Sequence, residues 1–479
     1  MKPIHKILAA CLLAAVAVGC GKTSVPGLTM LTSFISVGST GDSQQVAFKT
    51  NQSWSVRPDV SWVSVDPPSG GASDSYQSVK VTVEPNPDPV ERTATLTVTA
   101  GEKTAAVQVK QAGAPAAKQL TISEFRNTKA DKTTWYKLTG EIAAIANEDR
   151  GYFYLVDETG FVYVYGLCEK QVETNDQSFP KLALKPGDTV TMMTLRSEYN
   201  ETIEAGGTIP AYFVSKTDGE YRLGQKVSST AAGWLELPAT SAADGQDLLI
   251  HRFPDGSRSY AAYYDYEHLV SSWVAYPLHK DNIGSGSRTA DSAFPMDPLL
   301  PRDKQAVLAS GFKDGGAGKF DRGHQIASAD RLDWRVNIET FFSTNMTPQL
   351  NGLNAEGWAT LEIKVRDWAR KSDTLYVVTG CSVAGSNKYA LDNDGKKVTV
   401  PTGYYKALLR LDREKNYTAL GIWMDHAANS ATSITKDMVM SIDELEKKVG
   451  VDFFVNLPSD VQKAVEAQNP SDEAWWWNN

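Results

Sequence analysis

One segment is the most informative about the C-terminal half of this chain: Lys319-Phe320-Asp321-Arg322-Gly323-His324-Gln325. Residues 342–349, Phe-Ser-Thr-Asn-Met-Thr-Pro-Gln, follow it, and a helical pattern over 355–371 comes next. Asn354 is well placed as the N-cap of this predicted helix. Asn354, Trp358, Glu362 and Arg366 are spaced by four residues. Each step drifts by only about 40° around a helix, so an amide, a carboxylate and a guanidinium share one side.

Taken together, these segments resemble the DNA/RNA non-specific endonuclease family. Three further segments agree with the resemblance: 273–276, 285–288 with 297–298, and 400–406. The resemblance covers about the last half of the chain. The resemblance implies an α+β domain with the ββα-metal fold over residues 231–479. We expect residues from about Gln225 onward to fold and cut alone.

The resemblance also implies a role for each candidate residue. His324 would be the general base, and its ordinary pKa near 6.5 suits that task at neutral pH. Asn354 would be the direct ligand of Mg²⁺, with Mn²⁺ as a substitute, and Glu362 would hold a metal-bound water. The remaining candidates would contact or support the scissile phosphate: Arg322 and Arg366 directly, Arg288 as a third contact, and Asn345 through hydrogen bonds.

The N-terminus predicts an export signal. Basic residues precede an apolar run over 7–18, which is too short to span a bilayer as a helix. The run ends in Ala17-Val18-Gly19-Cys20, which resembles a bacterial lipoprotein signal. We expect a signal peptide over 1–19, lipidation of Cys20 and a tether over 20–27. The protein would then be held at the outer membrane by its lipid alone. The sequence leaves open whether it faces the periplasm or the cell surface. An ordinary secreted protein is the alternative.

Residues 28–113 predict an all-β sandwich. Short strands with alternating faces occur at 46–48, 79–83, 94–98 and 106–109, separated by Pro- and Gly-rich turns. The spacing of Trp54, Trp62 and Arg92 resembles the BACON domain of Bacteroidetes proteins. Such domains are often proposed to bind carbohydrate. The alternative, which we favour, is that Trp54 and Trp62 are core residues and the domain is a spacer.

Residues 118–224 predict an OB-fold-like barrel, with strands at 135–145, 152–157, 162–165 and 189–195. OB-folds often bind single strands on an aromatic face. The aromatic residues available for such a face are Tyr152, Phe153, Tyr154, Tyr163 and Tyr165. The alternative is that these rings are ordinary strand and barrel-core residues.

Composition limits the remaining functions. The 48 Lys and Arg against 57 Asp and Glu give a net charge of −9, which argues against a basic nucleic-acid coating protein but leaves room for a local basic cleft. The function predicted is a Mg²⁺-dependent endonuclease acting on DNA and RNA at the cell envelope. The alternative is a glycan- or nucleic-acid-binding lipoprotein with an inactive nuclease domain. Oligomeric state stays open, and Trp475-Trp476-Trp477 predicts either a terminal strand or a packing plug.

Overall fold

The structure is a computed structural model that describes residues 25, 27–115, 117–228, 233–241, 245–289 and 293–479. The chain divides into two compact units, Met1–Ala116 and Ala117–Asn479. The predicted signal peptide and Cys20 lie outside the described residues. None of the described helices combines the length and the apolar character needed to cross a bilayer.

Two sheets make up the first unit, and their buried side chains form one apolar core. One sheet has the order β1 (Leu28–Met30), β3 (Asp42–Thr50), β7 (Ser73–Val83), β5 (Val63–Asp66). The other has the order β2 (Phe34–Val37), β9 (Lys103–Gln111), β8 (Arg92–Ala100), β4 (Trp54–Pro58), β6 (Ser69–Gly70). Trp54 is buried with its ring edge-on to Phe48 at 4.9 Å, so it is a core residue. Trp62 lies under the Arg92 guanidinium at 4.1 Å.

The second unit begins with a closed five-stranded barrel. Its strands are β11 (Tyr136–Asn147), β12 (Tyr152–Asp157), β13 (Gly160–Cys168), β16 (Thr202–Thr217) and β14 (Thr189–Thr194). Closure comes from β11, which pairs with both β12 and β14. Additional elements flank the barrel: β10 (Lys118–Gln119), α1 (Ile122–Arg126), η1 (Phe179–Leu182) and β15 (Arg196–Tyr199).

The aromatic residues of the barrel do not form the exposed face predicted from the sequence. Phe153 is fully buried in the barrel core. Tyr154 and Tyr163 point the other way but are also buried, in a cluster shared with the C-terminal domain. Tyr165 is exposed and Tyr152 is half-buried against the same cluster, and the two rings stack with centroids 4.3 Å apart. The prediction of an aromatic binding face is therefore wrong for three of its five rings.

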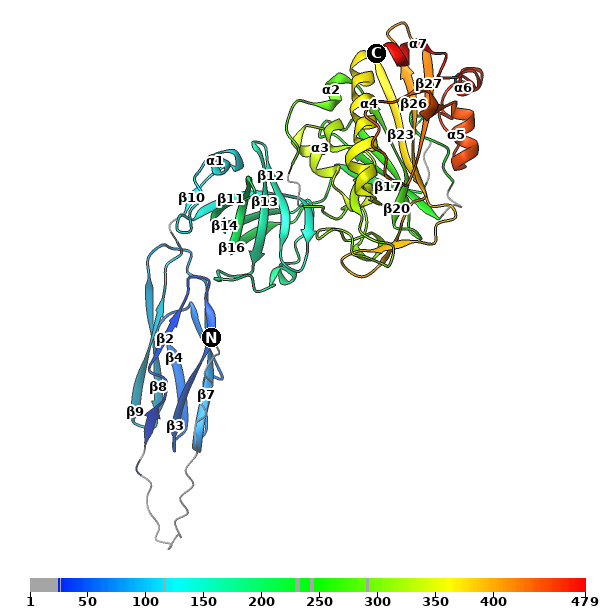
Figure 1. The fold of residues 1–479 in the computed structure, drawn as a ribbon. Helices are drawn as coiled ribbons and strands as arrows, with labels where there is room; N and C mark the ends of the chain where they lie inside the picture. Colours follow the sequence, from blue (N-terminus) through cyan, green and yellow to red (C-terminus); the bar gives the residue numbers. More distant parts are fainter. Residues whose placement is uncertain (1–24, 26, 116, 229–232, 242–244, 290–292) are drawn as a thin grey trace. The chain divides into compact units, whose positions relative to one another are not determined.

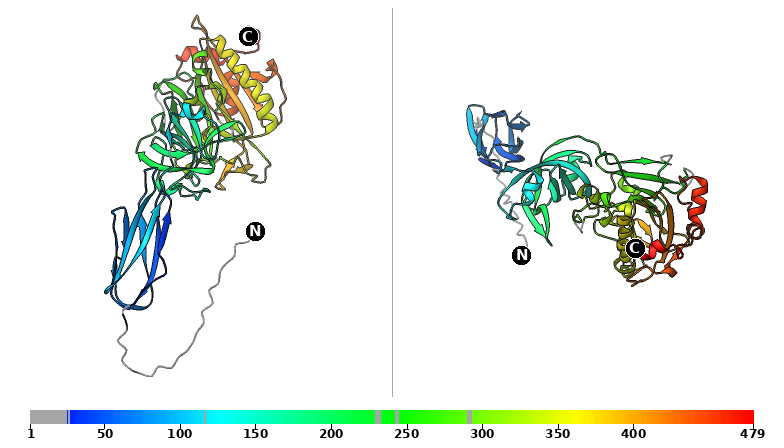
Figure 2. Two further views of the ribbon diagram at one scale, coloured as in Figure 1. Left: turned by 90° about the vertical axis from the view of Figure 1, so that its left-hand side faces the viewer. Right: turned by 90° about the horizontal axis from the view of Figure 1, so that it is seen from above.

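An eight-stranded antiparallel sheet is the framework of the C-terminal domain (Figure 1). Its order is β17 (Gly224–Val227), β18 (Gln246–Arg252), β19 (Arg258–Asp265), β20 (Val270–Leu278), β23 (Thr374–Ser382), β26 (Gly403–Leu411), β27 (Tyr417–Asp425), β28 (Val439–Met440). Helix α4 (Ala359–Lys371) packs on one face. Figure 2 shows it in yellow beside the orange strands. Helices α5 (Ile442–Val449) and α6 (Ser459–Glu466) pack on the other face, so β26 is buried along its whole length.

The C-terminal tryptophans form a short helix, α7 (Ala474–Asn478), and not a strand. Trp476 is fully buried, edge-on to Trp368 of α4 at 4.9 Å. The Trp368 indole N–H donates to the Trp476 carbonyl at 3.2 Å. Trp476 therefore acts as a packing plug over α4, and Trp475 and Trp477 pack partly buried against the same core.

Shorter elements on the α4 face of the sheet carry the candidate site. Strands β21 (Asp321–His324) and β22 (Met346–Gln349) form an antiparallel pair, which a π-helical turn, η6 (Leu353–Trp358), connects to α4. Asn354 lies inside this turn and is not the N-cap that the sequence predicts, because the helical backbone already begins at Asn351. The other elements are α2 (Lys280–Ile283), η3 (Arg302–Lys304), η4 (Ser328–Asp330), α3 (Trp334–Glu339), η5 (Ser343–Asn345), β24 (Tyr389–Leu391), β25 (Lys397–Thr399) and η7 (Lys436–Met438).

Candidate active site

A cavity of about 560 Å³ opens beside the β21–β22 pair and the start of α4. Most of the residues predicted from the sequence line it: Arg288, Arg322, His324, Asn354 and Glu362. Two predicted residues, Asn345 and Arg366, do not line it. With Asp321, which also lines it, the cavity therefore gathers one imidazole, two guanidiniums, an amide and two carboxylates from segments up to 74 residues apart, from 288 to 362.

His324 stands at the end of β21, opposite Met346 in the ladder. Its ring lies between Phe341, edge-on at 5.1 Å, and Phe294 at 6.0 Å. Burial, with a smaller effect of Arg288 and Arg322, lowers the pKa of His324 to about 3. Its Nε2 atom is buried and makes no hydrogen bond among the described residues. The imidazole is therefore neutral at pH 7, which is the form that can accept a proton.

The same two phenylalanines carry the guanidiniums of the cavity. Arg322 lies over the Phe294 ring at 3.6 Å, and its Nη1 donates to the carbonyls of Leu308 at 3.0 Å and Ala309 at 3.3 Å. Burial is the main cause that lowers the pKa of Arg322, to about 10. Arg288 lies over the Phe341 ring at 4.8 Å. Both cations are thus held at the cavity wall, where an anionic phosphate would meet them.

Asn354 has the orientation that a metal ligand needs. Its Nδ2 donates to Oδ2 of Asp321 at 3.1 Å, and Asn351 donates to the same oxygen at 2.9 Å. Within the described residues no hydrogen bond reaches the Asn354 Oδ1, so this oxygen is available to a cation in the cavity. Asp321 was not among the predicted site residues, although it opens the Asp-Arg-Gly-His motif, and the motif is the signal that could have found it.

Glu362 shares its surroundings with a buried lysine, Lys406 of β26. Burial is the main cause that raises the pKa of Glu362 to about 7, and the Lys406 charge opposes this shift. Burial likewise lowers the pKa of Lys406 to about 8. The Lys406 ammonium donates to Thr379 Oγ1 at 3.0 Å and lies over the Trp358 ring at 4.5 Å. Lys406 belongs to the segment 400–406 that supports the family resemblance, but the sequence analysis predicts no role for it.

The two predicted residues outside the cavity, Arg366 and Asn345, make hydrogen bonds to residues next to it. Arg366 donates to Oδ1 of Asp330 at 2.9 Å, so its guanidinium faces a carboxylate. Asn345 is fully buried and bonds both backbone groups of Ile326, at 2.9 and 3.0 Å. Asn345 therefore fixes the chain two residues after His324, and its supporting role in catalysis stays a prediction.

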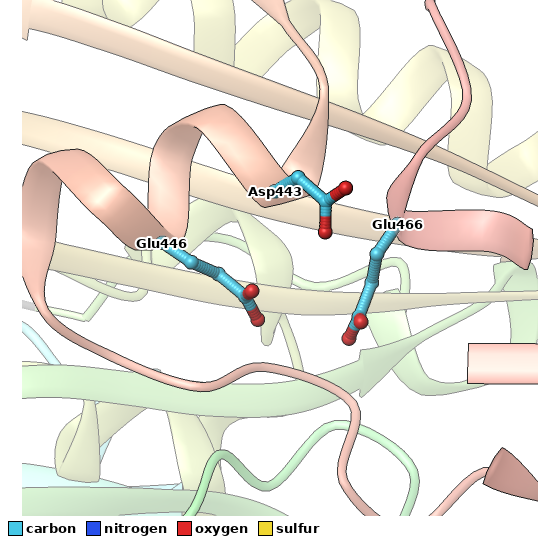
Figure 3. A group of neighbouring side chains, drawn as sticks. All are labelled: Asp443, Glu446 and Glu466. Carbon is cyan, nitrogen blue, oxygen red and sulfur yellow. The ribbon is translucent and has the colours of Figure 1, made fainter. Parts of the chain in front are cut away.

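A second group of titratable residues lies away from this cavity. Asp443 and Glu446 of α5 approach Glu466 of α6, with ligand atoms within 4.8 Å of one another (Figure 3). It is the one such cluster of His, Cys, Asp and Glu within the described part of the chain. Glu446 accepts from the backbone of Phe453, and Glu466 accepts from Gln462, so these carboxylates have protein partners. None of the three lines the cavity around His324.

Comparison with known proteins agrees with the geometry. Residues 245–460 match the family model of the DNA/RNA non-specific endonucleases, and residues 52–112 match the BACON model, an N-terminal binding domain. A nuclease from Nostoc sp. is 31% identical over 220 residues, which cover 44% of this chain and 76% of that protein. A nuclease from Serratia marcescens is 29% identical over 208 residues, 41% of this chain and 73% of that protein. A mitochondrial nuclease from Saccharomyces cerevisiae is 27% identical over 214 residues, 40% of this chain and 63% of that protein.

The cavity contains the imidazole, cations and oxygen ligands that phosphodiester hydrolysis needs, and it lies within the segment that matches the family model. Members of this family generally depend on a divalent metal. The protein carries a BACON domain and is a nuclease that belongs to the DNA/RNA non-specific endonuclease family.

Proposed function

We propose that this protein is a Mg²⁺-dependent endonuclease that hydrolyses DNA and RNA from a lipid-anchored position at the outer membrane. The observation that carries the proposal is one cavity in which a neutral imidazole, two guanidiniums and an oriented amide oxygen meet. Mn²⁺ would substitute for Mg²⁺. We further propose a β-sandwich for the first unit, an OB-fold for the barrel and the ββα-metal fold for β21, β22 and α4.

Each residue has a task in this proposal. His324 takes the proton of the attacking water, because it is neutral and faces the cavity. Asn354 Oδ1 and Glu362 would hold a hydrated cation, which supplies charge stabilisation at the reacting phosphate when bound.

Arg322 and Arg288 bind the phosphate. Arg366 donates to Asp330 from Nη1, and its other N–H groups would make the phosphate contact that the sequence predicts.

The proposed contacts involve phosphate and metal, and none reads a base edge. Broad substrate range follows, because contacts to the backbone position a nucleic acid without specifying its sequence. We therefore expect cleavage of double-stranded DNA, single-stranded DNA and RNA, with rates that fall as salt rises.

The test is a plasmid-nicking assay on purified full-length protein with Mg²⁺, with Mn²⁺ and with excess EDTA. We expect cleavage with either metal and none in EDTA. The matched control is His324→Ala, which should lose about 10²–10⁴-fold in rate. Full activity in EDTA would refute the metal site. An inactive wild type would favour a binding protein with an inactive nuclease domain.

Location requires its own experiment. Cys20→Ser should abolish metabolic labelling with a fatty acid and release the protein from the membrane fraction. A variant that stays in the membrane fraction without label would contradict the lipid anchor.

A further inference from the structure

One face of the barrel packs against the C-terminal domain through a buried apolar cluster. Its buried members from the barrel are Ala144, Ala146, Tyr154 and Tyr163, and those from the C-terminal domain are Ala293, Ile338 and Phe342. At the rim, Phe161 of β13 stacks on Trp334 of α3 with centroids 5.9 Å apart. The two domains therefore share a core, in keeping with their place in one compact unit.

Several hydrogen bonds cross the same interface, and three of them involve the segments that flank the cluster. The Met296 amide donates to the Ile145 carbonyl at 3.1 Å. The Arg335 guanidinium donates to the Asp157 carbonyl at 3.3 Å. The Tyr221 hydroxyl, in the segment between β16 and β17, donates to Glu339 of α3 at 2.7 Å. These bonds fix the barrel in register with the segments around residues 293–296 and 334–339.

The residues that meet the barrel are direct neighbours in sequence of those that enclose the candidate base. Ala293 lies in the interface, and Phe294 lies against Arg322 and His324. Likewise Phe342 lies in the interface, while the preceding Phe341 lies against His324. A shift of the interface thus reaches the base through a single peptide unit on each side. Packed protein interiors transmit such shifts, because they contain few voids to absorb them.

We propose that the barrel is a positioning element of the nuclease site, in which Tyr154 and Tyr163 hold the segments that carry Phe294 and Phe341 against His324. The inference rests on the proposed catalytic role of the cavity. It assigns these two tyrosines a role that does not require contact with substrate, metal or the reacting atoms.

The interface also changes one expectation from the sequence. A chain that begins near Gln225 would lack the barrel side of the cluster and would expose Ile338 and Phe342, which are buried here. It would also lack Tyr221 and the first residue of β17. The structure therefore argues against the expectation that this fragment folds and cuts alone.

The experiment uses the full chain and a matched pair of tyrosines on β13. Tyr163 is 5% exposed and lies in the interface, whereas Tyr165 is 40% exposed and lies outside it. The variants are Tyr163→Ala, Tyr163→Phe and Tyr165→Ala. Two substrates are compared: plasmid DNA, which is long enough to touch the barrel, and a nitrophenyl phosphodiester of a single nucleoside, which reaches only the cavity.

We expect Tyr163→Ala to lower kcat about 10- to 100-fold on both substrates, because small misplacements of catalytic groups have effects of this size. Tyr163→Phe should restore most of the rate, since it keeps the ring, and Tyr165→Ala should match wild type. Hydrogen exchange should become faster in residues 293–296 and 338–344 of Tyr163→Ala only. This second measurement does not depend on activity.

Three results would overturn the proposal. The first is a folded Tyr163→Ala with wild-type kcat on the small substrate and a raised KM for plasmid, which would show that the barrel feeds substrate. The second is unchanged hydrogen exchange in both segments. If Tyr163→Ala does not fold, Phe161→Ala at the rim of the interface replaces it as the test variant. An unchanged kcat of Phe161→Ala is the third result that would overturn the proposal. A wild type inactive on both substrates would refute the proposed function, whereas unchanged exchange would refute the positioning role.

Discussion

Acid should inhibit this enzyme through Glu362 and not through His324. Burial raises the pKa of Glu362 to about 7, while burial and the nearby guanidiniums lower the pKa of His324 to about 3. A carboxylate that holds a metal-bound water works in its ionised form, so its contribution is lost as the pH falls through about 7. A general base works in its neutral form, so the contribution of His324 is lost only as the pH falls through about 3.

The two assignments differ by a measurable amount. Between pH 8 and pH 6 the ionised fraction of Glu362 falls about tenfold, whereas the neutral fraction of His324 changes by less than about 1%. A histidine with the ordinary pKa of about 6.5 would instead lose about three quarters of its neutral form over the same range. The profile of kcat/KM, which reports ionisations of the free enzyme, separates these cases.

The assay is kcat/KM against pH for wild type and Glu362→Gln, at constant ionic strength, on a nitrophenyl phosphodiester. The wild type should lose about tenfold from pH 8 to pH 6, and higher Mg²⁺ should move this limb to lower pH, because a nearby cation favours the carboxylate. The weak activity of Glu362→Gln should be flat within about twofold, since His324 stays neutral. An acid limb near pH 6.5 in Glu362→Gln would refute the reasoning, because it would show that His324 titrates as an exposed imidazole does.

Three other predictions concern separate parts of the structure. Added imidazole, and not Mg²⁺, should restore part of the rate of His324→Ala, while high Mg²⁺ should restore part of the rate of Asn354→Ala. Initial rates of both variants across an imidazole series and a Mg²⁺ series check this, and the reverse pattern would contradict the assignment of His324 as the base. Lys406→Met removes a cation that lowers the pKa of Glu362, so the midpoint of the acid limb should move to higher pH; an unmoved midpoint in the kcat/KM profile would show that the two groups do not interact. Trp476→Ala should lower the free energy of unfolding of the C-terminal domain by about 3–5 kcal/mol with little change in kcat, measured by chemical denaturation; a loss below about 1 kcal/mol would show that the plug is dispensable.

The cavity could be predicted from the sequence to the extent that its spacing is local. Arg322 and His324 are two residues apart on one strand, so the alternation of side chains relates them. Asn354 and Glu362 lie on one helical segment, but the π-helical turn between them departs from the α geometry assumed from the sequence. Lys406 is different. It reaches Glu362 through the register of the central sheet, where it pairs with Thr379, and no local pattern contains that register.

The barrel shows the same limit. Phe153 and Tyr154 are adjacent on β12 and point to opposite faces, so one face cannot hold all five rings that the sequence analysis grouped together. The sequence of β12 does not show what covers the face of the barrel that carries Tyr154. The covering residues, Ile338 and Phe342, come more than 170 residues later in the chain. An aromatic side chain on a strand therefore looks the same in sequence whether nucleic acid or another domain covers it.

The π-helical turn at Leu353–Trp358 makes the number of residues between Asn354 and Glu362 as important as their identity. A π turn closes its hydrogen bonds one residue later than an α turn, so it holds an additional residue without breaking the helix. Removing one residue there would turn Asn354 by about 100° around the helix axis relative to Glu362. The chain can vary the side chains of this turn that face solvent, such as Ala355 and Glu356, but it cannot vary the length of the turn and keep both oxygens at the cavity.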